Sequence, residues 1–297
     1  MADDPYSHVA FSDESRFNVG RFRAVAVLTC ALPTADEFRG KVAPIIQNGD
    51  LREFKWHKLR QARDRFVAID LIGRSIDALS LSTIRIDVLI WDTHDSRHLV
   101  ENRDDNANLH RMYYHLLRNV MRLRWSSDST WMLYPDEHSA MDWQTLAQIF
   151  RHKSFSISQS PKDLLSSTVG YATRLRREFG IHAIQPVKSD QEPLCQIADL
   201  FAGIGAYSYS NFERYSMWMR YNDLQLSFEF DTPAAIALSN SERERFPVLK
   251  SLSEGCKSRS LGVSLNSSRG LRTHNPSYPI NFWKYVPQTE ADKAPTK

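Results

Sequence analysis

The feature that most constrains the fold is an aspartate in the middle of an apolar, small-residue stretch, P-L-C-Q-I-A-D-L-F-A-G, at residues 193–203. An aspartate in such a run is costly to bury unless a positive group meets it. Helical spacing places Gln196, Asp199 and Gly203 on one face, and the large apolar residues on the faces that pack. We therefore expect a buried helix whose Asp199 carboxylate points into a small polar cavity.

The rest of the first two thirds of the chain alternates short apolar runs with longer amphipathic ones. Strands are expected at 8–13, 21–32, 84–92, 130–134 and 181–187, the first two joined as a hairpin through 18–20. Helices are expected at 34–46, from the E-F-K-W-H-K-L stretch at 53–59 to about residue 79, and at 105–123, 142–150 and 164–179. This alternation predicts an α/β fold with a sheet covered by helices.

Length and composition predict one large domain with a tail. The chain has 297 residues, 42% of them hydrophobic, which is enough for a sizeable core. We divide it into a catalytic domain at 1–210 and a C-terminal aromatic and Ser-rich extension at 211–297, weakly organised beyond residue 251. No stretch approaches the ~20 apolar residues of a membrane span, and no signal peptide is recognisable, so we expect a soluble cytoplasmic protein that does not bind membranes.

Several common chemistries lack their sequence signatures. The cysteines Cys30, Cys195 and Cys256 form no C-x-x-C pair, which predicts reduced, buried thiols. The sequence contains no G-x-S-x-G, phosphate-loop or dinucleotide motif, and its histidines form no zinc pattern. His138, two residues from Asp136, is the histidine best placed to assist proton transfer. The net charge of +3 neither requires nor excludes a nucleic-acid partner.

Four carboxylates stand out by position: Asp13 and Asp136 end predicted strands, Glu53 precedes or begins a helix, and Asp199 lies inside one. Asp92 also ends a strand and competes with Asp136. Oxygen ligands suit Mg²⁺ or Mn²⁺, and two such ions about 4 Å apart support phosphodiester hydrolysis. Several acids converge only if bound cations offset their repulsion. A single strand-end aspartate is more often a turn or cap residue.

The motifs that carry these acids resemble a known family. They are D-E-S at 13–15, E-F-K-W-H-K-L at 53–59, a strand ending in D-E at 136–137, and S-D-x-E-P-L-C-Q-I-A-D-L-F-A-G at 189–203. Together, over residues 6–209, they are similar to the family called domain of unknown function 3800. The resemblance implies a ribonuclease H-like fold and a role in prokaryotic antiviral defence or mobile-element biology.

Carried over residue by residue, the resemblance implies that Asp13, Glu53, Asp136 and Asp199 bind Mg²⁺ or Mn²⁺, as two ions. Lys58, Ser189 and Gln196 would support them. This sequence has Arg16 where the family has a glycine after D-E-S, so the turn differs and places a cation beside the site. Glu14 faces the opposite side of its strand from Asp13, which makes it a second-tier residue. The family pattern also ranks Asp136 above Asp92.

Basic residues are candidates for contacts to nucleic acid. Arg174, Arg176 and Arg177 on one predicted helix, together with Lys188, are placed to follow a phosphate backbone, and a solvated helix face is the alternative. Nothing in the sequence chooses DNA over RNA.

Two main functions follow. The first is a two-metal nuclease that hydrolyses DNA or RNA, with Lys58 orienting groups or offsetting charge. The second is a non-catalytic module that keeps the fold and binds nucleic acid, a partner protein encoded nearby or a second copy of the chain, through the aromatic segment 207–221 and the Ser-rich tail. A phosphoesterase acting on small nucleotides is a third reading, because it needs the same metals and acids.

Overall fold

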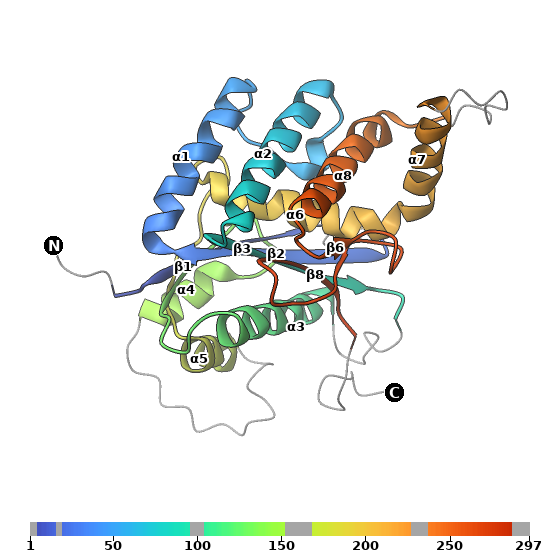
Figure 1. Ribbon diagram of the computed structural model, residues 1–297. Coiled ribbons are helices and arrows are strands. Elements are labelled where there is room, and N and C mark those ends of the chain that lie inside the picture. The colour runs from blue at the N-terminus through green and yellow to red at the C-terminus, as the bar shows by residue number, and fades with distance from the viewer. Residues whose placement is uncertain (1–4, 16–19, 96–103, 152–167, 227–236, 287–297) are drawn as a thin grey trace.

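The computed structural model describes residues 5–15, 20–95, 104–151, 168–226 and 237–286. Its centre is a six-stranded mixed sheet in the order β5-β4-β1-β2-β3-β8 (Figure 1). The strands are β1 (His8–Ser15), β2 (Phe22–Ala31), β3 (Ile84–Asp92), β4 (Trp131–Pro135), β5 (Ile181–Ile184) and β8 (Ile280–Lys284). β2 runs antiparallel to β1 and β3, whereas the β1–β4, β4–β5 and β3–β8 pairs are parallel. The expected hairpin and α/β class are confirmed.

Helices cover both faces of the sheet (Figure 1). One layer holds α1 (Leu32–Asn48), α2 (Ala62–Ser80), α6 (Pro193–Ser210), α7 (Phe212–Leu226) and α8 (Asn240–Ser258). The other holds α3 (Asp105–Leu117), continued by a π-helical turn η3 (Arg118–Arg122), then α4 (Trp143–Arg151) and α5 (Thr168–Phe179). Each layer buries its own apolar cluster against the sheet. Among the described residues, no helix combines the length and the apolar content needed to cross a membrane.

The alternation of β1 sends its two acids to opposite layers. Val9 and Phe11 join the cluster on the α6 side, whereas Ala10 joins the cluster on the α3 side. Because side chains alternate along a strand, Asp13 shares the α6 side and Glu14 the α3 side. The expected separation of these two carboxylates is therefore confirmed.

The stretch at 53–59 does not open the long helix that its pattern suggested. A single 3₁₀ turn, η1 (Trp56–Lys58), follows extended residues, and α2 begins only at Ala62. Gln61 and Asp64 form a reciprocal capping box at that start, which fixes the helix terminus. Local propensity is overridden here by hydrogen bonds from α6, described below.

The C-terminal extension is better organised than its composition suggested. β8 pairs in parallel with β3 and completes the sheet, and Phe282 is fully buried. α8 lies beside α2 in the same helical layer, and β6 (Val263–Ser264) pairs with β7 (Arg272–Thr273) in a small second sheet. The expectation of a weakly organised tail beyond residue 251 is therefore wrong for the described residues up to 286.

Candidate active site

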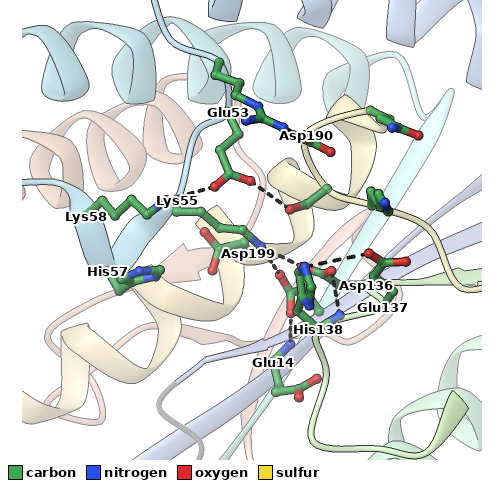
Figure 2. Close-up of a pocket in the computed structure, with 15 residues that line it drawn as sticks. Glu14, Glu53, Lys55, His57, Lys58, Asp136, Glu137, His138, Asp190 and Asp199 are labelled. Atoms are coloured by element: carbon green, nitrogen blue, oxygen red, sulfur yellow. Dashed lines mark hydrogen bonds and ion pairs between the residues drawn. The ribbon is translucent and has the colours of Figure 1, made fainter.

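A polar pocket of about 880 Å³ opens where β1 and β4 end, beside the middle of α6 (Figure 2). Acidic and basic side chains dominate its lining. They are Asp13, Glu14, Arg52, Glu53, Lys55, Lys58, Asp136, Glu137, Lys188, Asp190 and Asp199. The four carboxylates singled out in the sequence thus reach one pocket from β1, the 53–58 segment, the end of β4 and α6.

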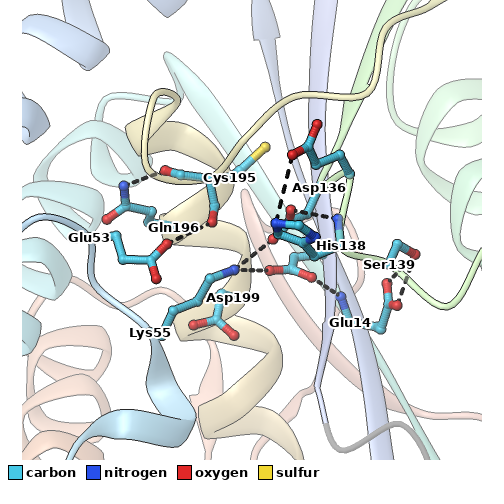
Figure 3. Close-up of polar contacts among 12 residues, drawn as sticks. Glu14, Glu53, Lys55, Asp136, His138, Ser139, Cys195, Gln196 and Asp199 are labelled. Carbon is cyan, nitrogen blue, oxygen red and sulfur yellow. Dashed lines mark hydrogen bonds and ion pairs between the residues drawn. The ribbon is translucent and has the colours of Figure 1, made fainter. Parts of the chain in front are cut away.

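Asp13 and Asp136 are neighbours because β1 and β4 are parallel and in register. Ser12 pairs with Pro135, and the Asp136 N–H donates to the Ser12 carbonyl over 3.0 Å. The Lys55 ammonium lies between the two acids, 2.6 Å from Asp136 Oδ2 and 3.5 Å from Asp13 Oδ2. Figure 3 shows this lysine pointing into the acid cluster. One ammonium therefore joins two carboxylates.

The polar face of α6 fixes the backbone of the 53–58 segment. Gln196 Oε1 accepts the Phe54 N–H over 2.6 Å, and Asp199 Oδ2 accepts the Trp56 N–H over 2.6 Å. Gly203 continues the same face and leaves room for the Trp56 side chain, since a Cβ there would meet three of its atoms. The helix face expected from the sequence is confirmed, and it binds a chain segment as well as lining the pocket.

Glu53 is oriented by two supporting residues that the resemblance indicated. Its Oε1 accepts from Lys58 Nζ over 2.9 Å, and its Oε2 accepts from Ser189 Oγ over 3.1 Å. Gln196 Nε2 donates to the Ser189 carbonyl, which links this pair to α6. Burial alone would raise the pKa of Glu53, but the Lys58 hydrogen bond and charge lower it overall. Glu53 therefore enters the pocket ionised.

The pocket carries excess negative charge. Burial, reinforced by the charge of Asp199, raises the pKa of Asp13 well above its usual value, and burial raises the pKa of Asp199 to about 6. Burial would lower the pKa of Lys55, but the charges of Asp13 and Asp199 and the contact with Asp136 raise it. The lining contains seven carboxylates and four cationic side chains. An anionic substrate would enter only if further positive charge offset this excess.

The donor set suits a divalent cation, but the donors are not gathered into a finished site. Carboxylate oxygens are the ligands that Mg²⁺ and Mn²⁺ prefer. Within the described ranges, no three His, Cys, Asp or Glu side chains are grouped closely enough to hold an ion. The Lys55 ammonium stands between Asp13 and Asp136. The residues fit a metal by chemistry, with Lys55 supplying the positive charge in this arrangement.

Glu14 binds the turn that follows Asp136 instead of facing the other acids (Figure 3). Its carboxylate accepts from Tyr113 Oη over 2.8 Å, from Ser139 Oγ over 2.8 Å and from the Ala140 N–H over 2.7 Å. Burial raises its pKa despite these hydrogen bonds. Its second-tier role at the site stays a prediction.

Asp92 lies outside the pocket. It accepts two hydrogen bonds of 2.8 Å from Arg21 and one of 3.3 Å from Lys284, and the Arg21 bonds lower its pKa to about 2. Of the two competing strand-end acids, the structure therefore brings Asp136, not Asp92, to Asp13.

Two proteins of Methanothermobacter thermautotrophicus, described as uncharacterized proteins ORF2' and ORF2, align with nearly the whole chain. ORF2' is 35% identical over 295 residues and ORF2 is 36% identical over 298, with 97% of each chain covered in both cases. The chain belongs to the ORF2 family. No protein-family model matches this ORF2-family chain. Among solved structures, a chain of the PCNA:RNase HII complex from Archaeoglobus fulgidus is similar at 15% identity and a TM-score of 0.36, covering 80% of this chain and 84% of that one.

The expected basic residues divide between two places in the ORF2-family chain. Lys188 lines the acid pocket. Arg174 and Arg176 are engaged on α5, where Arg174 lies 5.5 Å from the Tyr114 ring and Arg176 donates to the Phe150 carbonyl. Arg177 is exposed on the same helix, in the layer across the sheet from α6. The structure therefore does not gather the three arginines with the acids, and Arg16 lies outside the described residues.

Two histidines line the pocket, His57 and His138. The His138 ring is 79% exposed, with Nε2 3.7 Å from Glu137 Oε1, while its backbone N–H donates to Asp136 Oδ1 over 3.1 Å. Burial and the charges of Lys58 and Lys55 lower the pKa of His57. His138 thus lies at the solvent side of the acids, and its part in proton transfer stays a prediction.

Lys55 is the residue that sequence reasoning missed in this ORF2-family site. Its signal is the spacing of Glu53 and Lys55, which share one side of an extended segment. Interpretation of the stretch as the approach to a helix hid that signal. Arg245 of α8 was also missed. Its guanidinium donates to the Trp56 and His57 carbonyls over 2.8 and 3.0 Å, so the C-terminal extension holds the 53–58 segment from the other side.

Proposed function

We propose that the protein is a metal-dependent nuclease that hydrolyses phosphodiester bonds of DNA or RNA. The observation that carries the proposal is the convergence of Asp13, Glu53, Asp136 and Asp199, from four separate elements, on one pocket. Fold stability alone does not favour such a cluster, because neighbouring carboxylates repel each other. A phosphodiester-cleaving site does, because hard cations and their carboxylate ligands stabilise charge on the reacting phosphate.

The proposal includes a ribonuclease H-like fold and membership of the domain of unknown function 3800 family. The adjacency of β1 and β4, each followed or ended by an acid, supports it, since such a fold places an acid on its first and fourth strands. The motif resemblance supports the same family and its defence or mobile-element context. The identity shared with the ORF2 proteins neither names an activity nor contradicts this one.

Asp13, Glu53, Asp136 and Asp199 would hold Mg²⁺ or Mn²⁺. When bound, these ions would neutralise phosphate charge and lower the pKa of an attacking water. The protein's own side chains do the positioning. Lys58 and Ser189 orient the Glu53 carboxylate. Asp199 uses Oδ2 to fix the Trp56 N–H, so Oδ1 is its oxygen for a cation.

Lys55 and His138 have distinct tasks in this proposal. The Lys55 ammonium, 2.6 Å from Asp136 Oδ2, offsets repulsion among the acids before substrate and cations arrive. Its remaining N–H groups are hydrogen-bond donors suited to a phosphate oxygen. His138, at the exposed rim, is placed to give a proton to the leaving oxygen.

The test is cleavage of labelled single- and double-stranded DNA and RNA with Mg²⁺, Mn²⁺ or chelator. We expect Asp136→Asn and Asp199→Asn to lose cleavage and chelator to abolish it. Asp77→Asn is the matched control, because it makes the same change at an acid that is paired with Arg259 at the surface and lies outside the pocket. Cleavage by Asp199→Asn at the parent rate, or full activity in chelator, would overturn the proposal.

A second candidate is the non-catalytic module that keeps the fold. The position of Lys55 favours it, because its ammonium already lies between Asp13 and Asp136. Among the described residues, no group of side chains is arranged to hold a metal ion. Calorimetry separates the two. The nuclease should bind Mn²⁺ with loss of binding in Asp13→Ala, whereas the module should bind no Mn²⁺ and cleave none of the four polymers.

A further inference from the structure

A second pocket, of about 350 Å³, lies at the same edge of the sheet as the acid pocket and has the opposite character. Four cationic side chains line it: Arg21 before β2, Arg214 in α7, Arg269 in the loop before β7 and Lys284 at the end of β8. Glu213 is the acidic side chain in its lining. Parts of the chain far apart in sequence thus bring positive groups together.

Acids behind the pocket hold these cations in place. Asp92 binds Arg21 over 2.8 Å and Lys284 over 3.3 Å, and Glu242 binds Arg214 Nη2 over 2.9 Å. The Asp92 and Glu242 side chains are 7% and 12% exposed, whereas those of Arg21 and Arg214 are 53% and 43% exposed. The acid end of each pair therefore points inward and the cation end faces solvent.

The ion pairs leave donors for another group. Arg21 and Arg214 both use Nε and Nη2 for their carboxylates, so these pairs do not engage Nη1. A guanidinium held in this way keeps its planar fork oriented, which favours binding of a phosphate. The lining of this pocket holds four cationic side chains and one carboxylate, Glu213, which is paired with Arg269, whereas the lining of the acid pocket holds seven carboxylates and four cationic side chains.

The spacing between the two pockets suits a polynucleotide. Asp199 and Tyr209 line different pockets and are ten residues apart on α6, which corresponds to about 15 Å at the rise of a helix. Phe22 is four residues along β2 from Ala26, the partner of Asp13, which corresponds to about 13 Å at the rise of a strand. Successive phosphates on one strand of a duplex are spaced about 3.4 Å apart along the helix axis and follow a curved path, so this span corresponds to no more than about four nucleotides.

We propose that this pocket is a subsite for a backbone phosphate of a polynucleotide, no more than about four nucleotides from the bond cut in the acid pocket. The inference rests on the proposed nuclease function and narrows its substrate class to polymers, because a mononucleotide would not reach from one pocket to the other. Arg21, Arg214, Arg269 and Lys284 contact phosphate and carry no sequence information.

The experiment measures, by fluorescence anisotropy at several salt concentrations, how tightly the protein binds fluorescein-labelled 20-nucleotide DNA and RNA, single- and double-stranded. The test variant is Arg269→Gln combined with Lys284→Gln, made in the Asp136→Asn background so that the probe is not cut. Each lost phosphate contact should reduce the salt slope by about 0.7–0.9 and weaken binding about five- to eightfold at 0.1 M salt. Arg269→Lys should largely retain binding.

Arg259→Gln is the matched control, since Arg259 is 53% exposed and paired with Asp77 but lines neither pocket. The control should bind as the parent does. Equal binding and equal salt slopes for the double variant and the control would overturn the subsite.

A second readout separates this inference from the nuclease proposal. With Asp136 restored, the double variant should cleave a 20-residue substrate more slowly than the parent but a dinucleotide at the parent rate. Equal slowing on both substrates would refute the subsite while leaving the nuclease intact. If the parent cleaves no substrate but the double variant still binds nucleic acid more weakly and with less salt dependence, the phosphate subsite stands and the nuclease proposal fails.

Discussion

Replacement of Gly203 by alanine should disrupt the contact between α6 and the 53–58 segment. A Cβ built on Gly203 would lie 2.7 Å or less from the Cβ, Cγ and Cδ1 atoms of Trp56, closer than real Cβ atoms approach other heavy atoms. The Trp56 side chain is 2% exposed, and protein interiors are packed closely enough that rotation of a buried indole would require its neighbours to shift. The added methyl group should therefore push the segment away from the helix.

Three contributions set the change in the free energy of unfolding, one favourable and two unfavourable. Alanine in a helix interior is favoured over glycine by about 1 kcal/mol. Insertion of a methyl group into a packed core costs about 1–3 kcal/mol. Displacement of the segment also breaks the 2.6 Å hydrogen bond from the Trp56 N–H to the Asp199 carboxylate, worth about 1.5–3 kcal/mol for a charged acceptor. We expect a net loss of about 1.5–5 kcal/mol in the free energy of unfolding.

Urea unfolding of the parent, Gly203→Ala and Gly73→Ala measures this directly. Gly73 lies inside α2 with no atom within 4 Å of a built Cβ, so the same substitution there should raise stability by about 1 kcal/mol. The nuclease proposal adds that Gly203→Ala should lose cleavage, because Glu53 and Lys55 move with the segment. Stability of Gly203→Ala equal to that of Gly73→Ala would refute the packing argument.

Three further outcomes are expected. The hydrogen bond from Arg214 lowers the pKa of Glu242 from 4.5 to about 2. Glu242→Gln should therefore destabilise the protein at neutral pH. The difference in unfolding free energy between variant and parent should vanish as the pH falls from about 5 to 2, as measured by urea titrations at each pH. Glu14→Gln should lower stability by about 1–3 kcal/mol in chemical unfolding, because an amide NH₂ would face the donors that Glu14 accepts. Arg245→Lys should keep the charge but lead to faster amide hydrogen exchange in the 53–58 segment. One ammonium does not reproduce the contacts of the guanidinium with two carbonyls. Unchanged exchange would contradict the role of Arg245 in holding this segment.

The sheet and most of its acids could be predicted from local patterns. Alternation along β1 and the apolar run before Asp136 indicate strands that end in carboxylates, and parallel neighbours in a sheet bring such ends together. The helical face of Gln196, Asp199 and Gly203 follows from a periodicity of 3.6 residues. These features depend on residues close in sequence, which is why they were accessible.

The 53–58 segment could not be predicted in this way. Its extended backbone is held by side chains about 140 residues away on α6, and by Arg245 nearly 190 residues away. No local pattern encodes those partners, so the position of Lys55 between two acids emerged only from the structure. β8 could not be predicted for the same reason, since its pairing partner β3 is distant in the sequence. Its five residues alone resemble an isolated apolar run.

The late position of β8 and Arg245 in the chain has a consequence for biosynthesis. A nascent polypeptide that has not yet reached Arg245 and Ile280–Lys284 lacks the guanidinium that contacts Trp56 and His57 and the outer strand that pairs with β3. Pairing across so long a separation is also slow, because the entropy of closing the loop opposes it. The contacts that hold the 53–58 segment beside the acid pocket are therefore complete only after Arg245 has been synthesised.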